Sequence, residues 1–194
     1  YDYDRIRGLF RPGHGDFTYT EKYGFRDHRG GGRASGRETA ARVAAGAVAE
    51  KFCRQYGLDV MAHTVMLGGI WAERKNMIEV THEQIDTNLL KCHDYAAAQL
   101  MAEKLEQVRK DGDTVGGIVE IFVRGCPTGL GEPVFDKIDA DLAQALMSIG
   151  SVKGVEIGDG FNAAAQIDNF LFPFHFGNNR FANPDHIFSA GFRI

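Results

Sequence analysis

The chain has 194 residues, enough for one good-sized hydrophobic core and short for two full domains. Hydrophobic residues make up 44% and charged residues 25%, as in ordinary globular proteins, and no apolar run approaches the length of a membrane span. The net charge of −4 is uneven, because residues 22–42 hold six bases against two acids, leaving 16 of the 22 bases and 24 of the 26 acids elsewhere. A single basic patch favours a small anionic ligand over general nucleic-acid binding, which needs a wider basic footprint.

The start of the chain, YDYDRIRGLF, is charged and lacks the apolar segment of a signal peptide. Because it begins at Tyr1 and not at Met, we expect a fragment of a longer protein. Cys53, Cys92 and Cys126 are widely spaced and odd in number, which fits neither a disulfide framework nor a CxxC metal site. They predict a reducing, cytoplasmic setting in which each cysteine is a small buried hydrophobe.

A helix is predicted from Ser35, because Glu38 three residues later completes a capping-box signature. The apolar residues that follow are mostly alanine and valine, and the pattern ends near Gly57. Small apolar residues on every face predict that this helix is buried between layers.

The later elements alternate between strands and helices. Hydrophobic spacing and turn signals predict the following segments in chain order: a strand over 60–73 with a Gly-Gly interruption, an amphipathic helix from Thr81 to the KDGD turn at 110–113, a strand over 115–125, a helix over 135–149, and a strand with a glycine turn over 151–161. This order predicts an α+β fold.

The composition changes after Gln166. Residues 167–194 hold seven of the 14 phenylalanines and no lysine, and Phe170 to Phe176 alternate like a strand interrupted by Pro173. We expect residues 1–166 to form one partial domain. Residues 167–194 form an atypical Phe-rich tail, either part of the same domain or poorly ordered.

The segment YGFRDHRGGGRASGRETAARVAAGA, residues 23–47, combines arginines with three consecutive glycines. Glycines let the backbone approach a ligand, and the helix predicted after them offers free N–H groups to an anion. Arg29 and Arg33 flank the glycines and Arg37 follows one helical turn later, which suits a ligand with several negative charges. An ordinary turn with solvated arginines is the alternative. An RGG-type nucleic-acid segment is weaker, because only one copy is present.

His14 lies in a turn-rich loop between Arg11 and Asp16, where a histidine can be exposed and paired with polar groups. Imidazole titrates near neutral pH, so His14 could hold or donate a proton beside an anionic ligand. A purely structural histidine is the alternative. The other histidines show no pair at metal-ligand spacing, so the sequence predicts no metal site.

Residues 9–47, LFRPGHGDFTYTEKYGFRDHRGGGRASGRETAARVAAGA, closely resemble one signature region of the chorismate synthase family, and residues 129–161 resemble a second. The match is strong over residues 1–57 and 112–166. The resemblance implies a cytoplasmic homotetramer built on an incomplete β-α-β sandwich. It implies a lyase of the shikimate pathway that converts 5-enolpyruvylshikimate 3-phosphate to chorismate by anti-1,4-elimination of phosphate, using reduced FMN. It implies no nucleic-acid or membrane partner.

The resemblance also implies roles for individual residues. One of the family's two active-site histidines, which protonates or stabilises the flavin, matches His14. The flavin-binding positions match Arg33, Ala34 and Ser35 and, after the third predicted helix, Gly150 and Ser151. A substrate contact is expected at Arg37, together with Ser35.

The sequence departs from the family pattern in several places. Gly15 stands where the family has alanine, and Ala34-Ser35-Gly36 stands where it has Ser-Ser-Ala. The Gly-Glu-Ser-His-Gly motif with the second histidine, the Arg-His-Asp-Pro motif and the Asn-His-Ala-Gly-Gly flavin loop are not found in the 194 residues. The alternative function is therefore a fragment that binds FMN or another phosphorylated ligand without turnover. The sequence leaves open whether a nicotinamide cofactor reduces the flavin on this protein.

Overall fold

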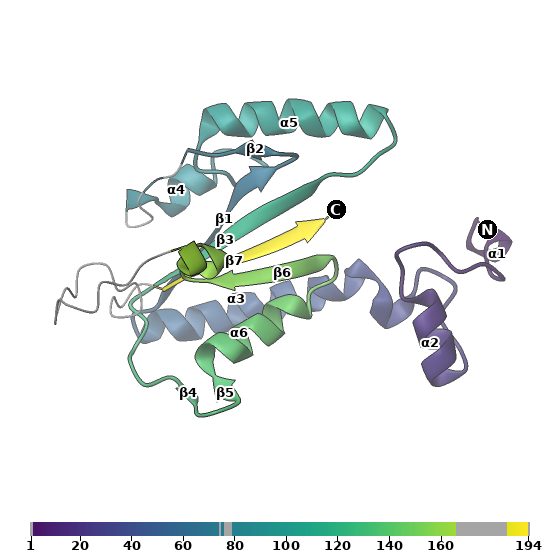
Figure 1. Cartoon of the computed structure of the whole chain (residues 1–194), viewed down its shortest axis with the longest axis horizontal. Coiled ribbons are helices and arrows are strands. Elements are labelled where there is room, and N and C mark those ends of the chain that lie inside the picture. The colour runs from purple at the N-terminus through teal and green to yellow at the C-terminus, as the bar shows by residue number, and fades with distance from the viewer. Residues whose placement is uncertain (1, 74, 76–78, 166–185, 194) are drawn as a thin grey trace. The chain divides into compact units, whose positions relative to one another are not determined.

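The computed structural model describes residues 2–73, 75, 79–165 and 186–193, and the chain forms two compact units, Tyr1–Ala49 and Glu50–Ile194 (Figure 1). The first unit contains short helices joined by turns. Its elements are α1 (Asp2–Arg5), α2 (Asp16–Tyr23) and the 3-10 turns η1 (Gly32–Ala34) and η2 (Gly36–Glu38). Helix α3 (Thr39–Gln55) runs from the first unit into the second.

The second unit is built on an antiparallel sheet with strand order β2-β1-β3-β7-β6. Its elements in chain order are β1 (Asp59–Leu67), β2 (Ile70–Trp71), α4 (His82–Ile85), α5 (Tyr95–Lys110), β3 (Gly116–Arg124), β4 (Gly131–Glu132), β5 (Asp136–Lys137), α6 (Ile138–Met147), β6 (Val152–Ile157), η4 (Gly160–Ala165) and β7 (His186–Arg193). The predicted combination of helices and strands is confirmed. So are the Gly-Gly break, which separates β1 from β2, and the strand at β3.

Two apolar clusters hold the second unit together. One lies between α5 and the sheet, with Leu67, Cys92, Met101 and Val115 buried in it. The other joins Met61 and Phe122, which are cross-strand partners in β1 and β3, to residues near α4. Helix α5 lies beside β2 at one edge of the sheet, and α6 packs along β6 at the other (Figure 1).

The single amphipathic helix predicted from Thr81 is wrong, because the structure has two helices, α4 and α5, over this stretch. The Asn88 side chain closes the loop between them, accepting from the Cys92 amide at 3.2 Å and donating to the Cys92 carbonyl at 2.7 Å. Lys91 has φ 53°, which no α-helix can contain. Asp94 then caps α5 by accepting from the Ala97 amide, as short polar side chains do.

Helix α3 differs from its prediction in both start and burial. It begins at Thr39, because the chain first makes two 3-10 turns and the Ser35 hydroxyl caps the second by accepting from the Arg37 amide. No side chain of α3 is buried by the described residues, and Val43, Val48 and Phe52 are each at least 60% exposed. Alanine on every face made the helix equally compatible with burial and with exposure, so composition alone misjudged it.

Three further predictions concern the cysteines, the membrane and the tail. Cys92 is fully buried as predicted, whereas Cys53 and Cys126 are only partly buried.

No helix among the described residues is long and apolar enough to cross a membrane. The alternating phenylalanines at 170–176 lie outside the described residues, and β7 pairs between β3 and β6. The division at residue 166 stays a prediction.

Candidate functional site

The three-glycine loop of the first unit is held close to functional side chains. All three glycines have positive φ, 107° at Gly30, 92° at Gly31 and 52° at Gly32, a region that residues with a Cβ rarely enter. A Cβ on Gly31 would lie 2.5 Å from His14 Cε1, and one on Gly30 would lie 2.5 Å from Arg37 Nη2. The glycines are therefore needed to let His14 and Arg37 approach the backbone.

The sequence predicted that the glycine loop leads directly into an α-helix, and this prediction is wrong. Two 3-10 turns follow it, and α3 begins six residues after Arg33. The groups of this segment that an anion would meet are therefore side chains more than the N–H groups of a helix N-terminus.

Arg37 and Arg33 differ in whether the side chain makes hydrogen bonds within the protein. Arg37 folds back, donating from Nε to Ser35 Oγ at 3.2 Å and from Nη2 to the Arg29 carbonyl at 3.4 Å. The Arg33 side chain is exposed and has no hydrogen bond or ion pair to the described residues. Arg33 is thus available to a ligand, while Arg37 would have to exchange weak contacts for stronger ones to an anion.

His14 lies beside Asp16 and Arg11. Its Nδ1 is 2.9 Å from Asp16 Oδ1, and Arg11 makes a two-point ion pair with the same carboxylate, 2.8 Å from Nε to Oδ2 and 2.9 Å from Nη2 to Oδ1. The predicted polar pairing of His14 is confirmed, and its side chain is 22% exposed.

Asp16 and Arg26 are the residues of this site that the sequence did not single out as functional. Asp16 is 2% exposed, and Arg26 Nη1 lies 3.2 Å from it while Arg26 Nη2 donates to the carbonyls of Arg7 and Leu9. Hydrogen bonding from Arg11, followed by smaller contributions that include the charge of His14, holds the pKa of Asp16 far below its usual range. A carboxylate two residues from a histidine was the available signal, but its burial was not visible in the sequence.

Gly150 and Ser151, the second predicted flavin-binding pair, lie in the second unit at the turn between α6 and β6. Ser151 has φ 72°, an uncommon backbone state for a residue other than glycine, and such residues are found at turns and ligand sites. The flavin-binding role of this pair stays a prediction.

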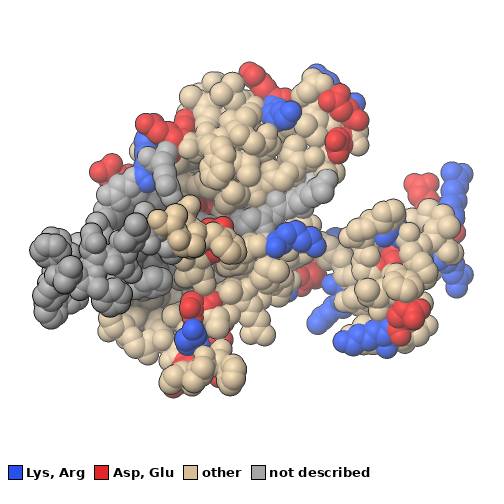
Figure 2. All heavy atoms as spheres, in the orientation of Figure 1, with Lys and Arg blue, Asp and Glu red and all other residues tan. Residues whose placement is uncertain are grey.

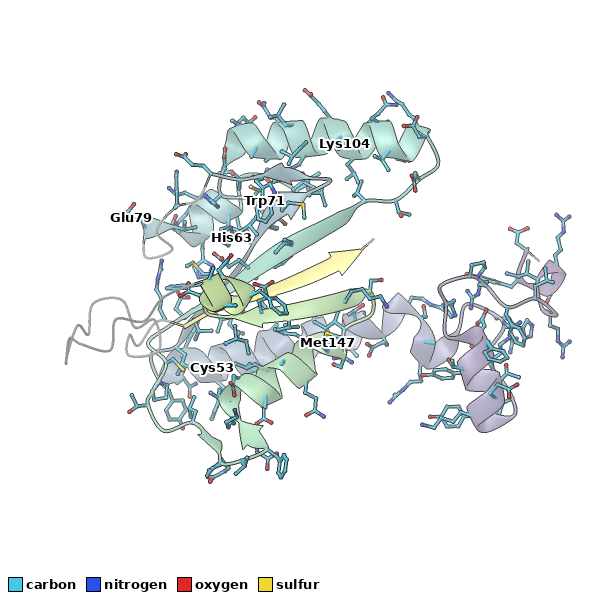
Figure 3. The ribbon with its side chains drawn as sticks, viewed as in Figure 1. Cys53, His63, Trp71, Glu79, Lys104 and Met147 are labelled. Carbon is cyan, nitrogen blue, oxygen red and sulfur yellow. The ribbon has the colours of Figure 1, made fainter. Side chains whose placement is uncertain are left out.

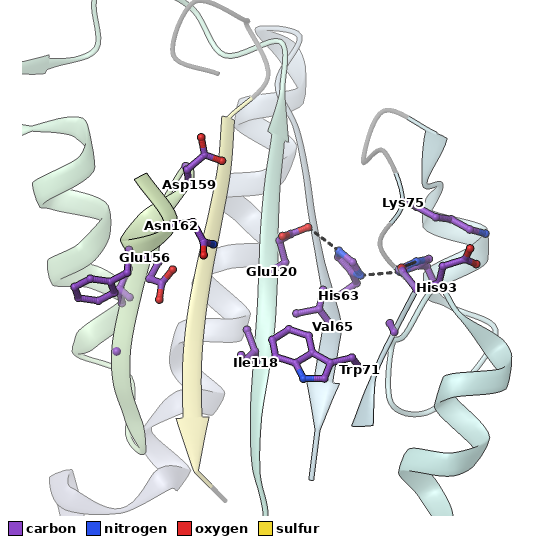
Figure 4. A pocket seen from close by; sticks show the side chains of 16 residues that line it. His63, Val65, Trp71, Lys75, His93, Ile118, Glu120, Glu156, Asp159 and Asn162 are labelled. Carbon is purple, nitrogen blue, oxygen red and sulfur yellow. Dashed lines mark hydrogen bonds and ion pairs between the residues drawn. The ribbon is translucent and has the colours of Figure 1, made fainter. Parts of the chain in front are cut away.

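The second unit contains a cavity of about 660 Å³ on the sheet, lined by β1, β3, β6 and neighbouring turns (Figure 4). His63 on β1 and Glu120 on β3 are direct cross-strand partners, and both side chains reach the cavity. Trp71 on β2 lies over the apolar end of the cavity, near Val65 and Ile118 (Figures 3 and 4). The space-filling view shows acidic and basic side chains scattered among uncharged ones on the face that it presents (Figure 2).

A hydrogen-bonded chain runs along this cavity from Glu120 to the backbone of Glu73. The distances are 3.3 Å from Glu120 Oε1 to His63 Nε2, 3.0 Å between Nδ1 of His63 and Nδ1 of His93, and 3.1 Å from His93 Nε2 to the Glu73 carbonyl. A carbonyl only accepts, so His93 Nε2 donates and a neutral His93 accepts at Nδ1 from His63.

The two histidines were not paired by sequence reasoning, because 30 residues separate them and only the return of the chain after α4 brings them together. No group of three or more His, Cys, Asp or Glu in the described ranges is arranged to hold a metal ion.

His93 predicts a pH dependence of stability. Burial, followed by the charge of His63, lowers the pKa of His93 from its ordinary value near 6.5. As the pH falls below that value the unfolded chain binds the proton first, so the free energy of unfolding should decrease from pH 7.5 to pH 5.5. Urea unfolding at both pH values should show a smaller decrease in His93→Gln than in the original chain. The matched control is His82→Gln, at a 43% exposed histidine; an unchanged decrease in His93→Gln would contradict the assignment.

Comparisons with known proteins agree with the sequence resemblance. The chorismate synthase family model matches residues 1–169. Chorismate synthase of Syntrophus aciditrophicus (strain SB) is 62% identical over 162 residues, covering 84% of this chain and 45% of that protein. Chorismate synthase of Methanococcoides burtonii is 54% identical over 165 residues, covering 85% and 44%. The chain thus spans less than half the length of these curated relatives.

A solved chorismate synthase crystal structure shares the fold, with a TM-score of 0.75 at 27% identity, over 92% of this chain and 62% of that one. The fold and the site define a mixed α/β protein in which a histidine and arginines gather around a glycine loop. The chain belongs to the chorismate synthase family.

Proposed function

We propose that this chain supplies part of a chorismate synthase active site, which eliminates phosphate from 5-enolpyruvylshikimate 3-phosphate to give chorismate. The observation that carries the proposal is the approach of His14 and Arg37 to the glycine loop, 2.5 Å from the Cβ positions of Gly31 and Gly30. The substrate carries a phosphate and two carboxylates. Two arginines and an ionisable histidine match those charges.

The same loop suits reduced FMN, which family membership implies. His14 and Arg37 lie against the backbone of Gly31 and Gly30, so a group bound at this loop would meet an imidazole and a guanidinium together. We place Arg33, Ala34 and Ser35 at the flavin, with Gly150 and Ser151 as a second contact. When bound, reduced FMN would supply an electron transiently to help phosphate leave.

The residues of this chain would bind and move protons. Arg37 would leave Ser35 and the Arg29 carbonyl to bind a substrate anion, which forms stronger, charge-assisted hydrogen bonds. Ser35 Oγ only accepts from Arg37, so its hydroxyl proton would be donated to either ligand. His14 would hold or donate a proton at Nε2, the ring nitrogen that faces the glycine loop. Homotetramer formation belongs to the same proposal.

An anaerobic titration with reduced FMN, with and without 5-enolpyruvylshikimate 3-phosphate, tests the proposal. The flavin spectrum and phosphate release should be followed together. Flavin binding that depends on substrate would support a partial site, and phosphate release would support a working one. No binding of either ligand would contradict the proposal.

The second candidate is a binder of FMN or another phosphorylated ligand without turnover. The exposed Arg33, which no described residue pairs, favours it. Under this function, flavin binds equally with and without 5-enolpyruvylshikimate 3-phosphate, and phosphate is not released.

Arg33→Ala should weaken binding of reduced FMN or substrate by about 1.5–3 kcal/mol, roughly 10- to 150-fold, because a charged hydrogen bond is lost. Calorimetric or fluorescence titration of the chain measures the affinity. Arg54→Ala is the control, since Arg54 pairs with Glu50 within α3. An unchanged affinity in Arg33→Ala would remove Arg33 from the site.

A further inference from the structure

The cavity on the sheet of the second unit has no part in the proposed function. Its volume of about 660 Å³ falls within the range of roughly 300–1,000 Å³ that small-molecule sites occupy. Its lining residues all belong to the second unit, so its geometry does not depend on the first unit. We call it the sheet cavity.

The register of the strands explains why this face of the sheet is hollow. Ile118 on β3 pairs with Gly191 on β7, and Gly191 pairs with Gly154 on β6. Directly paired residues of neighbouring strands lie on the same face, so this row has one side chain followed by two glycines. A Cβ on Gly154 would meet nothing within 4 Å, so the space above it is open.

The next row on the same face carries acidic side chains. His63 pairs with Glu120, Glu120 with Ser189, and Ser189 with Glu156, which places the two glutamates two strand spacings apart, about 10 Å between backbones. Figure 4 shows Glu120 between His63 and the side of the cavity that holds Glu156. One lysine, Lys75, also lines the cavity. The lining carries a net negative charge, because its carboxylates are Glu73, Glu120, Glu156 and Asp159.

The buried end of the sheet cavity presents two hydrogen-bond acceptors to each other. With both histidines neutral, His93 donates from Nε2 to the Glu73 carbonyl, and His63 donates its one proton from Nδ1 to His93. His63 Nε2 then accepts, and it lies 3.3 Å from Glu120 Oε1, which also accepts. The His63 side chain is only 1% exposed. An ammonium group in the cavity has three N–H donors and could serve both atoms.

The other end of the sheet cavity is apolar and aromatic. Trp71 lies there near Val65 and Ile118, and it is 62% exposed (Figure 4). An indole is the best of the aromatic side chains at attracting a cation to its face, and it also packs well against an apolar ligand body.

We propose that the sheet cavity binds a small organic cation, a protonated primary amine on an aromatic or alkyl body. The ammonium group donates to Glu120 and to His63 Nε2, and the body packs against Trp71. The net negative lining excludes organic anions of the same shape. This site is separate from the glycine loop, so it does not rest on the proposed function.

The proposal can be tested on the unaltered chain, because Trp71 is its single tryptophan and lies in the cavity. Its fluorescence should be titrated in an amine-free buffer at neutral pH with three compounds of similar shape: 2-phenylethylamine, which is protonated, the neutral 2-phenylethanol, and the anion 3-phenylpropionate. The amine should give a saturable change at least about 10-fold tighter than the alcohol, because its hydrogen bonds are charge-assisted. The anion should give no saturable change.

Two results of this titration would overturn the proposal. Changes that rise linearly and equally for the three compounds would show only collisions with an exposed indole. Equal saturable binding of the amine and the alcohol would show an apolar pocket with no preference for a cation.

Glu120→Gln then locates the ammonium group. The substitution removes a carboxylate and should weaken binding of 2-phenylethylamine by about 10-fold, with little effect on the alcohol. Glu103→Gln is the matched control, at an exposed glutamate of α5 outside the cavity lining, and should leave the affinity within about twofold. An unchanged affinity in a folded Glu120→Gln chain would contradict the assigned contact. The comparison of the three compounds needs no variant to fold.

Discussion

His14→Ala is expected to lower the rate of chorismate formation by roughly 10²–10⁴-fold, the usual contribution of a general acid or base. The expectation rests on geometry: the His14 ring is held by Asp16 at 2.9 Å, and its far edge faces Gly31. No other histidine among the described residues Asp2–Ala49 lies against the glycine loop in this way. His28 instead faces Asp4, at 3.6 Å.

The measurement uses a hybrid in which this chain replaces the matching segment of the Syntrophus relative, so that a chain of full family length is assayed. Anaerobic turnover with reduced FMN and 5-enolpyruvylshikimate 3-phosphate gives kcat. His82→Ala is the matched control, because His82 pairs with Asp59 at the surface of the second unit and should leave kcat within about twofold. A near-normal rate for His14→Ala would make His14 structural.

Gly31→Ala is expected to destabilise the first unit by about 1–3 kcal/mol, since alanine is strained in the left-handed region and Gly31 has φ 92°. The new methyl would also lie 2.5 Å from His14 Cε1 and 3.2 Å from Arg11 Nη2. A shift of the imidazole away from this methyl would change its 2.9 Å contact with Asp16. Gly31→Ala should therefore shift the NMR signals of the His14 ring as well as lower the stability of the first unit.

Amide hydrogen exchange over residues 14–35 measures this effect, because the single tryptophan, Trp71, reports on the other unit. Gly36→Ala is the control: Gly36 has no positive φ, and a Cβ there would meet nothing within 4 Å. Equal protection in the two variants would show that the glycine loop does not need to approach His14.

The sequence by itself determined the family and the local elements of this protein. Two long ordered motifs specified the family, and runs of apolar and β-branched residues bounded by turn signals specified β1 and β3. The Gly-Gly pair also predicted the break between β1 and β2 correctly. Both glycines take positive φ in that turn, which other residues rarely do. The residues expected around the glycine loop were named from resemblance and chemistry, and their roles remain predictions.

Only the tertiary structure decided the contacts between residues distant in sequence and the degree of burial. It split one predicted helix through the Asn88 side chain, left α3 exposed, and joined His63 to His93 across 30 residues. It also showed that Asp16 is buried beneath two arginines and lies beside His14. Periodicity records which face of an element is apolar. Burial and ionisation depend on which groups the folded chain brings alongside, and no local pattern contains that information.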